Sequence, residues 1–264
     1  MKKFLVIGNP IEHSLSPKLH NYWIKKNNLN AVYEKQKLNE NEIKDLILDV
    51  KKGKLNGINV TVPFKQTVIP FLDKLSTESE KTNSVNTIYL EGGKTIGHNT
   101  DIEGFKLGIK SSKINIQEKK ILILGAGGVT SSIVLALKKM KASKIMISNR
   151  TKSRIINLTK LFDDLEIIEW GKIPMFDIII NATSVGLKDD DRLELDFSNT
   201  DNNKIFYDLI YNPQETNFLK IGKSLGNQTE NGKLMFIYQA LMAFEIWHGI
   251  RPEVNSDVIK LLEK

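Results

Sequence analysis

The chain has 264 residues, 41% of them hydrophobic and 26% charged, and a net charge of +7 at pH 7. This length favours two domains or one large domain, and this balance is that of an ordinary soluble globular protein. No apolar run approaches the roughly 20 residues that span a bilayer. The sequence has no cysteine, which excludes disulfides, cysteine-ligated zinc and cysteine nucleophiles.

The N-terminal segment carries two lysines before an apolar stretch, as a signal peptide does. The stretch, 4–7, is too short for a signal peptide and ends in a turn, so we expect a strand there and a cytoplasmic protein with no membrane partner. The four histidines lack metal-ligand spacing, so no metal is expected. The lysines are scattered, which disfavours nucleic-acid binding. The positive charge suits either anionic small molecules or a general richness in Lys, Asn and Ile.

Apolar runs alternate with helical patterns along the whole chain, which predicts an α/β fold with mainly parallel strands. In the first half, Ser16 is a predicted helix N-cap, and Asn39 with Glu42 predicts a capping box. Gly92 and Gly93 predict a hairpin turn. We expect strands at 4–7, 31–35, 57–61, 85–90 and 94–98, and helices beginning at 16 and 39 and spanning 101–111.

The second half opens with the run KKILILG at 119–125, typical of a buried parallel strand. Further strands are expected at 144–148, 176–182 and 205–210. Helices are expected from the glycines after 125 to about 140, at 153–161 and 216–225, from 232 onward, and at 256–262. No repeat or linker separates the two halves, so a domain boundary must lie in a helix or a short loop.

Three glycines, Gly125, Gly127 and Gly128, lie between a predicted strand and a predicted helix. Gly125 permits a tight turn, and Gly127 lets the backbone approach a pyrophosphate at the helix N-terminus. The third glycine position of the general dinucleotide pattern is Thr130. The alternative is a tight strand–helix turn that binds nothing, but the surrounding strand and helix favour a dinucleotide site.

The end of the next strand distinguishes the two common dinucleotides. An NAD site usually has an acidic residue about 20 positions after the glycines, to bond the ribose hydroxyl. This chain has Asn149, Arg150 and Thr151 there, followed by Arg154. Arg150 can bind a 2′-phosphate, and Thr151 can add a hydroxyl. A solvated basic patch is the alternative, and NADP is the preferred interpretation.

A second group of polar residues suggests ketone chemistry. Asn59 and Thr61 alternate on one predicted strand and therefore face the same way, and Lys65 follows in a loop. Asp101 lies at a loop–helix junction, where its carboxylate could pair with a lysine. A Lys–Asp pair can deliver the proton that ketone reduction requires. The simpler alternatives are a solvated surface lysine and a helix cap.

Several sequence blocks occur in an order that resembles the shikimate dehydrogenase family. They are GNPIEHSLSPKLHN (8–21), NVTVPFKQ (59–66), SVNTI (84–88), GHNTDIEGF (97–105), GAGG (125–128), NRT (149–151), NATSVG (181–186), YNPQET (211–216) and the segment from Gly232 through Met235 to Gln239. The resemblance covers nearly the whole chain. It departs at Asn83 and Ser84, where the family often has Gly-Ala, and at Leu234, where it often has Gly.

The resemblance implies an α/β substrate domain formed by 1–100 and 233–264, and a Rossmann-like NADP-binding domain at 101–232, with the active site in the cleft between them. It implies NADPH-dependent reversible reduction of 3-dehydroshikimate to shikimate, a step toward chorismate and the aromatic amino acids. Lys65 and Asp101 would be the catalytic residues. A homodimer is compatible with the family.

The resemblance also assigns binding residues. Ser14 and Ser16 would bind the substrate carboxylate, although Ser16 is also the predicted N-cap. The other implied substrate residues are Asn59, Thr61, Lys65, Asn86, Asp101, Tyr211 and Gln239. The implied cofactor residues are Gly125, Ala126, Gly127, Gly128, Val129, Asn149, Arg150, Thr151, Arg154, Thr183, Val185, Gly232 and Met235.

Two alternatives remain open. The first is a quinate/shikimate dehydrogenase of the same family that uses NAD. The second is a non-catalytic NADP-binding sensor, which would keep the glycine turn and Arg150 but would have no reason to hold Lys65 and Asp101 together.

Overall fold

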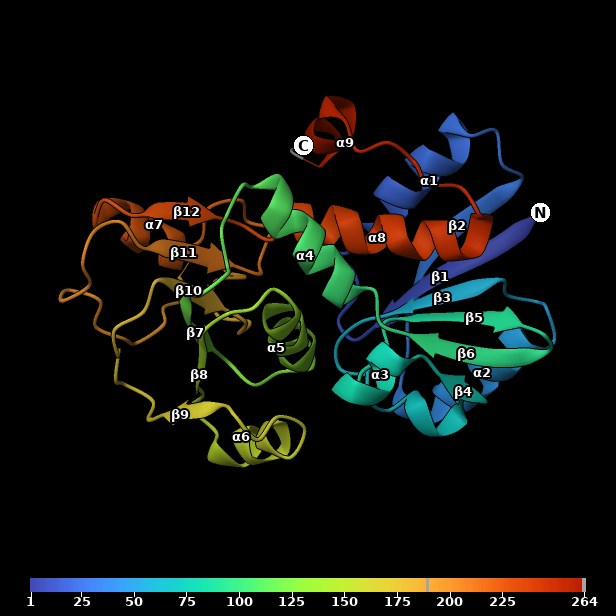
Figure 1. Ribbon diagram of the computed structural model, residues 1–264. Helices are drawn as coiled ribbons and strands as arrows, with labels where there is room; N and C mark the ends of the chain where they lie inside the picture. Colours follow the sequence, from blue (N-terminus) through green and yellow to red (C-terminus); the bar gives the residue numbers. More distant parts are fainter. Residues whose placement is uncertain (189, 263–264) are drawn as a thin grey trace. The chain divides into compact units, whose positions relative to one another are not determined.

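Each half of the predicted strand–helix alternation forms its own six-stranded sheet in the computed structural model, which describes residues 1–188 and 190–262 (Figure 1). The chain divides into two units. The first comprises Met1–Gly104 and Ile237–Lys264, and the second comprises Phe105–Phe236. The predicted α/β fold is confirmed.

The first unit contains a mixed sheet of strand order β2-β1-β3-β5-β6-β4. β1 pairs in parallel with β2 and β3, whereas β5 runs antiparallel to both β3 and β6. Its elements are β1 (Lys2–Gly8), α1 (Ser16–Lys26), β2 (Ala31–Lys37), α2 (Ile43–Lys51), β3 (Gly57–Val60), β4 (Lys74–Leu75), α3 (Thr77–Thr82), β5 (Thr87–Glu91), β6 (Lys94–His98), the first turn of α4 (Asp101–Ser111), most of α8 (Lys233–His248) and α9 (Ser256–Leu261).

Alternating side chains of β1 supply both faces of this sheet, because successive residues of a strand point in opposite directions. Leu5 and Ile7 join α2 in one buried cluster. Phe4 faces the other side, where its ring lies 5.0 Å from that of Trp247 on α8. The strand is therefore apolar on both faces, which explains its continuous hydrophobic run.

The second unit contains a sheet of order β12-β11-β10-β7-β8-β9 in which every pair of neighbours is parallel. Numbered along the unit, this is the order 6-5-4-1-2-3 of doubly wound dinucleotide-binding sheets. Its elements are β7 (Lys120–Leu124), α5 (Thr130–Lys139), β8 (Lys144–Ser148), α6 (Lys152–Thr159), β9 (Glu166–Ile168), β10 (Ile178–Asn181), β11 (Ile205–Asp208), α7 (Asn217–Ser224) and β12 (Gln228–Glu230).

Most predicted elements are confirmed to within a few residues. The strands β4, β9 and β12 and the helix α3 were not predicted. The three strands have only two or three residues each and β9 and β12 lie at sheet edges, so their sequences carry no usable alternation. The helix α3 is polar throughout, and its start depends on Ser76, whose Oγ accepts the Ser79 N–H at 3.2 Å.

The predicted N-cap role of Ser16 is wrong. Ser16 is the first residue of α1, and Leu15 precedes it as the cap. The hydroxyl that accepts a backbone N–H at this end belongs to Ser14, whose Oγ accepts the Ser16 N–H at 3.3 Å. Capping therefore does not occupy the Ser16 hydroxyl. The predicted capping contact at 39–42 is present, since the Asn39 N–H donates to Glu42 Oε2 at 2.7 Å.

None of the helices within the described ranges has the length and hydrophobicity that a bilayer crossing requires.

Candidate active and cofactor-binding residues

A buried ion pair joins Lys65 and Asp101 in the first unit. Lys65 lies in the loop after β3 and Asp101 begins α4, yet Lys65 Nζ lies 2.5 Å from Asp101 Oδ2, and the two side chains are only 11% and 7% exposed. The Lys65 carbonyl is anchored by the Val85 N–H at 2.8 Å. Lysine is almost never buried without a partner, so a solvated surface lysine is the wrong interpretation of Lys65.

Sheet topology explains why these residues meet. The carboxyl ends of β1, β3 and β6 and the beginning of antiparallel β5 share one edge of the sheet, because Asn59 pairs with Thr87 and Thr87 pairs with His98. The chain leaves β6 through Asn99 and Thr100 and enters α4 at Asp101. Lys65 and Asp101, which are 36 positions apart in the sequence, are thus brought to the same edge.

Asn86 holds the second oxygen of the Asp101 carboxylate. Its Nδ2 donates to Asp101 Oδ1 at 2.8 Å and to Thr100 Oγ1 at 2.9 Å. Its Oδ1 accepts the backbone N–H of Thr100 at 2.8 Å. Asn86 is 2% exposed, so its amide acts on the carboxylate from within the protein. Both Asp101 oxygens are therefore bonded, one to a cation and one to an amide.

Asn59 is linked to the same network. Its Nδ2 donates to the Asn86 carbonyl and to Thr87 Oγ1, each at 3.1 Å, and its Oδ1 accepts the Tyr33 hydroxyl at 2.6 Å. Thr87 Oγ1 in turn donates to Asn86 Oδ1 at 3.0 Å. A continuous chain of buried hydrogen bonds thus runs from Asn59 to Lys65.

The remaining predicted substrate residues of this unit lie on neighbouring segments. The β1–α1 loop, which carries Ser14 and leads to Ser16 at the start of α1, begins beside the segment after β3, where the Asn9 N–H donates to the Val62 carbonyl at 3.0 Å. A Cβ on Gly8 would lie 2.6 Å from Thr61 Cγ2, so glycine is needed for these segments to approach. Among the residues that the structure describes, no hydrogen bond joins Ser14, Ser16 or Thr61 to the Lys65–Asp101 network.

Gln239 lies on α8 against the first turn of α4. A Cβ on Gly104 would be 2.7 Å from the Gln239 backbone nitrogen, so the two helices touch at this glycine. This contact places Gln239 one helical turn from Asp101. The side chain is half-buried, and it is not the fully buried amide that its apolar helix suggested.

In the second unit, the glycine turn lies where the strand order reverses, between β7 and β10. Gly125 has φ +108°, and a Cβ there would lie 2.9 Å from the Ala182 carbonyl carbon, so only glycine fits. A Cβ on Gly128 would meet nothing within 4 Å, and one on Gly127 would meet only the Ala182 oxygen at 3.9 Å. The turn thus leaves open space before the N-terminus of α5, where a phosphate can be bound.

Thr130 stabilises this turn. Its Oγ1 accepts the Gly127 N–H at 3.0 Å and donates to the Gly125 carbonyl at 3.2 Å, and the residue is fully buried. The threonine at the third pattern position therefore replaces glycine packing with two hydrogen bonds. Ala126 and Val129 complete the turn, and Val129 is the cap residue of α5.

The predicted 2′-phosphate residues lie beside this turn. Asn149 Oδ1 accepts the Ala126 N–H at 3.1 Å, and Asn149 Nδ2 donates to the Thr151 carbonyl at 2.8 Å. Arg150, Thr151 and Arg154 are exposed at the start of α6, and Thr151 makes no capping bond with its side chain. Two cations, a hydroxyl and a helix N-terminus suit a phosphate dianion.

Thr183 and Val185 lie in the loop after β10, which Asn181 organises. Asn181 Oδ1 accepts the Thr183 hydroxyl at 2.7 Å, and its Nδ2 donates to the Val185 carbonyl and to Asp208 Oδ1, both at 3.1 Å. Asp208 also accepts the Thr216 hydroxyl at 2.6 Å. Burial raises the pKa of Asp208 to about 6, against these hydrogen bonds, which lower it.

Tyr211, Gly232 and Met235 lie close together beyond β11. The Tyr211 ring stacks on that of Phe236 at 4.4 Å, and the Gly232 N–H donates to the Ile210 carbonyl at 3.1 Å. A Cβ on Gly232 would clash with the Leu209 carbonyl oxygen, so glycine is required there. Met235 is buried.

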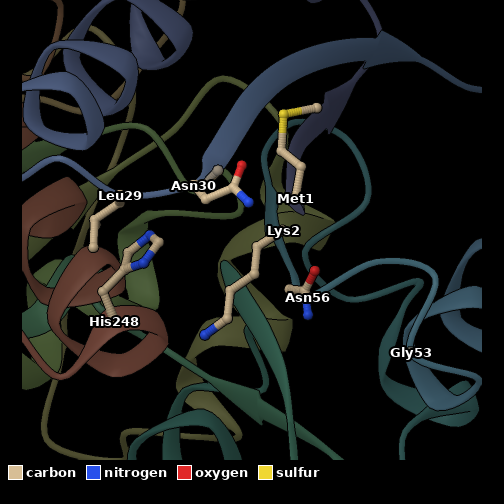
Figure 2. Close-up of a pocket in the computed structure, with 8 residues that line it drawn as sticks. Met1, Lys2, Leu29, Asn30, Gly53, Asn56 and His248 are labelled. Carbon is tan, nitrogen blue, oxygen red and sulfur yellow. The ribbon is translucent and has the colours of Figure 1, made fainter.

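A cavity of about 480 Å³ lies at the other edge of the first sheet, where β1 and β2 begin (Figure 2). Its lining residues are Met1, Lys2, Leu29, Asn30, Ala31, Gly53, Asn56 and His248. None of them belongs to the predicted site. Burial, together with the nearby Lys2 charge, lowers the pKa of His248 to about 4, so this imidazole is neutral at pH 7. Ligands of α/β sheets bind at the opposite, carboxyl edge.

Sequence reasoning missed Thr87, Thr100 and Tyr33. A signal existed for the first two, because the pair Asn-Thr occurs in both SVNTI and GHNTD. The two pairs meet across the β5–β6 hairpin and bond to each other. Tyr33 carried no such signal. Within the described ranges, no three His, Asp or Glu side chains gather as a metal site would require.

The model of the shikimate dehydrogenase substrate binding domain matches residues 6–88, and the shikimate / quinate 5-dehydrogenase model matches residues 108–209. The shikimate dehydrogenase (NADP(+)) of Pelagibacter ubique is 59% identical over 262 residues, which cover 99% of each chain.

Solved structures agree. The crystal structure of shikimate dehydrogenase from Aquifex aeolicus superposes with a TM-score of 0.91 at 38% identity, covering 100% of this chain and 98% of that one. The Thermus thermophilus shikimate 5-dehydrogenase, in complex with NADP(H) and shikimate, gives a TM-score of 0.89 at 29% identity over 100% and 98% of the chains. This chain belongs to the shikimate dehydrogenase family.

Proposed function

We propose that this protein is an NADP-dependent oxidoreductase that interconverts 3-dehydroshikimate and shikimate. The buried Lys65–Asp101 pair, found in a chain of this family, is the observation that carries the proposal. A cofactor sensor that never reduces a ketone has no use for a cation and an anion buried against each other, since burial is costly to both. The pair therefore favours an enzyme over the sensor.

In the proposed mechanism, bound NADPH supplies a hydride to the substrate carbonyl carbon. Lys65 Nζ gives a proton to the carbonyl oxygen and takes it back in the reverse reaction. Asp101 fixes the position of Lys65 through its Oδ2, and Asn86 holds Asp101 through its Oδ1. The positioned donor replaces a water molecule that would otherwise have to find the oxygen by diffusion.

The carboxylate and hydroxyls of the substrate require polar partners, and the proposed set is Ser14, Ser16, Asn59, Thr61, Asn86, Tyr211 and Gln239. The availability of the Ser16 hydroxyl, which caps no helix, supports its assignment to the carboxylate. Asn86 is the least direct member, because its amide is already bonded to Thr100 and Asp101. We assign it mainly to positioning Asp101.

For the cofactor, we propose that the turn from Gly125 to Val129 binds the pyrophosphate. Asn149, Arg150, Thr151 and Arg154 bind the adenosine 2′-phosphate. Open space at Gly127 and Gly128 supports the first assignment, and two exposed arginines at the start of α6 support the second. Thr183, Val185, Gly232 and Met235 are assigned to the nicotinamide side.

We further propose a substrate domain of 1–100 with 233–264 and a Rossmann-like NADP domain of 101–232. The protein is proposed to work in the cytoplasm in aromatic amino acid biosynthesis, as a monomer or homodimer, without nucleic acid.

The test is a steady-state assay of the purified protein with shikimate or quinate, each with NADP⁺ or NAD⁺, following reduced-cofactor absorbance. The highest kcat/KM is expected for shikimate with NADP⁺. The second family model includes quinate dehydrogenases by name, so quinate with NAD⁺ is the alternative that the assay must exclude. Absence of any reduced cofactor with shikimate would overturn the proposal.

A further inference from the structure

The hydroxyl of Thr87 lies between two amides of the proposed site. Thr87 Oγ1 accepts one N–H of Asn59 Nδ2 at 3.1 Å and donates to Asn86 Oδ1 at 3.0 Å. The residue is fully buried at the start of β5, directly opposite Asn59 on β3. Thr87 is not among the predicted site residues, yet its one hydroxyl is hydrogen-bonded to both of these side chains.

The directions of these hydrogen bonds are fixed by the backbone. Asn86 Oδ1 accepts the Thr100 backbone N–H at 2.8 Å, and a backbone N–H can only donate. The Asn86 amide therefore cannot flip, and its Nδ2 must face Asp101. Asn86 thus presents an oxygen to Thr87, whose hydroxyl donates to it at 3.0 Å and also lies 3.3 Å from Thr100 Oγ1. Thr87 accepts from Asn59, because Asn59 Nδ2 also faces the Asn86 carbonyl, which can only accept.

The same reasoning fixes Asn59. Both of its N–H bonds are used, on the Asn86 carbonyl and on Thr87 Oγ1. Its Oδ1 accepts the Tyr33 hydroxyl at 2.6 Å, and an amide oxygen has two lone pairs. What Asn59 can offer a ligand is one acceptor position, so it selects a group that donates, such as a ring hydroxyl.

We propose that Thr87 is a positioning residue whose hydroxyl fixes the Asn59 amide as a hydrogen-bond acceptor for substrate and couples it to the Asn86 amide that holds Asp101. This inference rests on the proposed function. Loss of the Thr87 hydroxyl would free one N–H of Asn59. The Asn59 amide could then rotate and present an N–H to a substrate hydroxyl that itself needs an acceptor.

Three variants test it. Thr87→Val keeps the shape and removes the hydroxyl, and Thr87→Ser keeps the hydroxyl. Thr95→Val is the matched control, because Thr95 is equally buried on adjacent β6 and its Oγ1 donates to Asp73 Oδ2 at 2.9 Å, outside the proposed site. Each is measured for KM of shikimate, kcat and urea denaturation midpoint.

Thr87→Val is expected to raise the shikimate KM about 3- to 10-fold with kcat changed less than about 2-fold, the range of one neutral hydrogen bond. Thr87→Ser should restore the wild-type KM. Thr95→Val should lower the denaturation midpoint and leave KM unchanged. In an Asn59→Ala background, Thr87→Val should raise KM by less than about 2-fold, because the two residues act together.

NMR of the side-chain amide resonances of Asn59 and Asn86 reports on the hydrogen-bond network independently of enzyme activity. Thr87→Val should shift both pairs and Thr95→Val neither. An active wild type with an unchanged KM in Thr87→Val overturns the inference and leaves the proposed function standing. An inactive wild type overturns the proposed function, and unshifted amide resonances would then overturn the inference independently.

Discussion

Replacing Lys65 with methionine removes the charge of a buried ion pair while keeping a side chain of similar length. Lys65 Nζ lies 2.5 Å from Asp101 Oδ2, and both side chains are nearly inaccessible to water. If Lys65 is the proton donor, turnover should fall steeply while the substrate-binding contacts remain. We expect kcat to decrease by roughly 10²- to 10⁴-fold, the usual contribution of a positioned acid–base group.

The Lys65→Met substitution also costs stability, because it leaves the Asp101 carboxylate buried without its cationic partner. Removing one partner of a buried pair typically costs about 3–5 kcal/mol, because the other charge loses its compensation. Here Asp101 keeps the Asn86 amide at 2.8 Å and lies at the first position of α4, where the helix dipole stabilises an anion by roughly 0.3–1 kcal/mol. We therefore expect a smaller loss, about 2–3 kcal/mol.

The assay is steady-state shikimate oxidation with NADP⁺, combined with urea denaturation of the same preparations. Asp101→Asn and the double variant complete a cycle. The double variant should be less destabilised than the sum of the singles, because it leaves no unpaired charge. If Lys65→Met retains folded structure and turns over within about 3-fold of the wild type, the acid–base assignment is refuted.

Three further outcomes are expected. Arg150→Ala should raise the KM of NADP⁺ about 10- to 100-fold and leave that of NAD⁺ nearly unchanged, since only the former carries the 2′-phosphate; equal effects on both would contradict the assignment. Gly125→Ala should lower the free energy of unfolding by about 2–4 kcal/mol, because φ is +108° and the new Cβ would lie 2.9 Å from the Ala182 backbone. Urea denaturation of the variant and the wild type measures this loss. The pKa of Asp208 is raised to about 6 from 3.8, so its contribution to stability is complete below about pH 4 and is lost as pH rises through 6. Between about pH 4 and pH 6, the free energy of unfolding should therefore fall less for Asp208→Asn than for the wild type, by at most about 3 kcal/mol. Urea denaturation of both proteins across this pH range measures the difference, and an equal fall in both would contradict the prediction.

Local sequence rules predicted most of the secondary structure, but they did not show which of several nearby hydroxyl groups makes a given hydrogen bond. Ser16 satisfies every composition rule for an N-cap, yet it is the first residue of the helix, and the hydroxyl of Ser14 accepts its N–H. Thr130 seemed a departure from the glycine pattern and proved to bond both sides of the turn. In both cases a side-chain hydroxyl competes locally, and the sequence does not show which one is within reach.

The sequence by itself determined most of the strands and helices, the glycine turn and the basic residues after the next strand, because these depend on periodicity, backbone freedom and neighbours along the chain. It also named Lys65 and Asp101. Only the tertiary structure decided that these two side chains are 2.5 Å apart and that Asn86, Thr87 and Asn59 join them in one buried network. The reason is topological, since antiparallel β5 brings its first residues to the edge where parallel β3 ends, and pairing across strands is not written in local sequence.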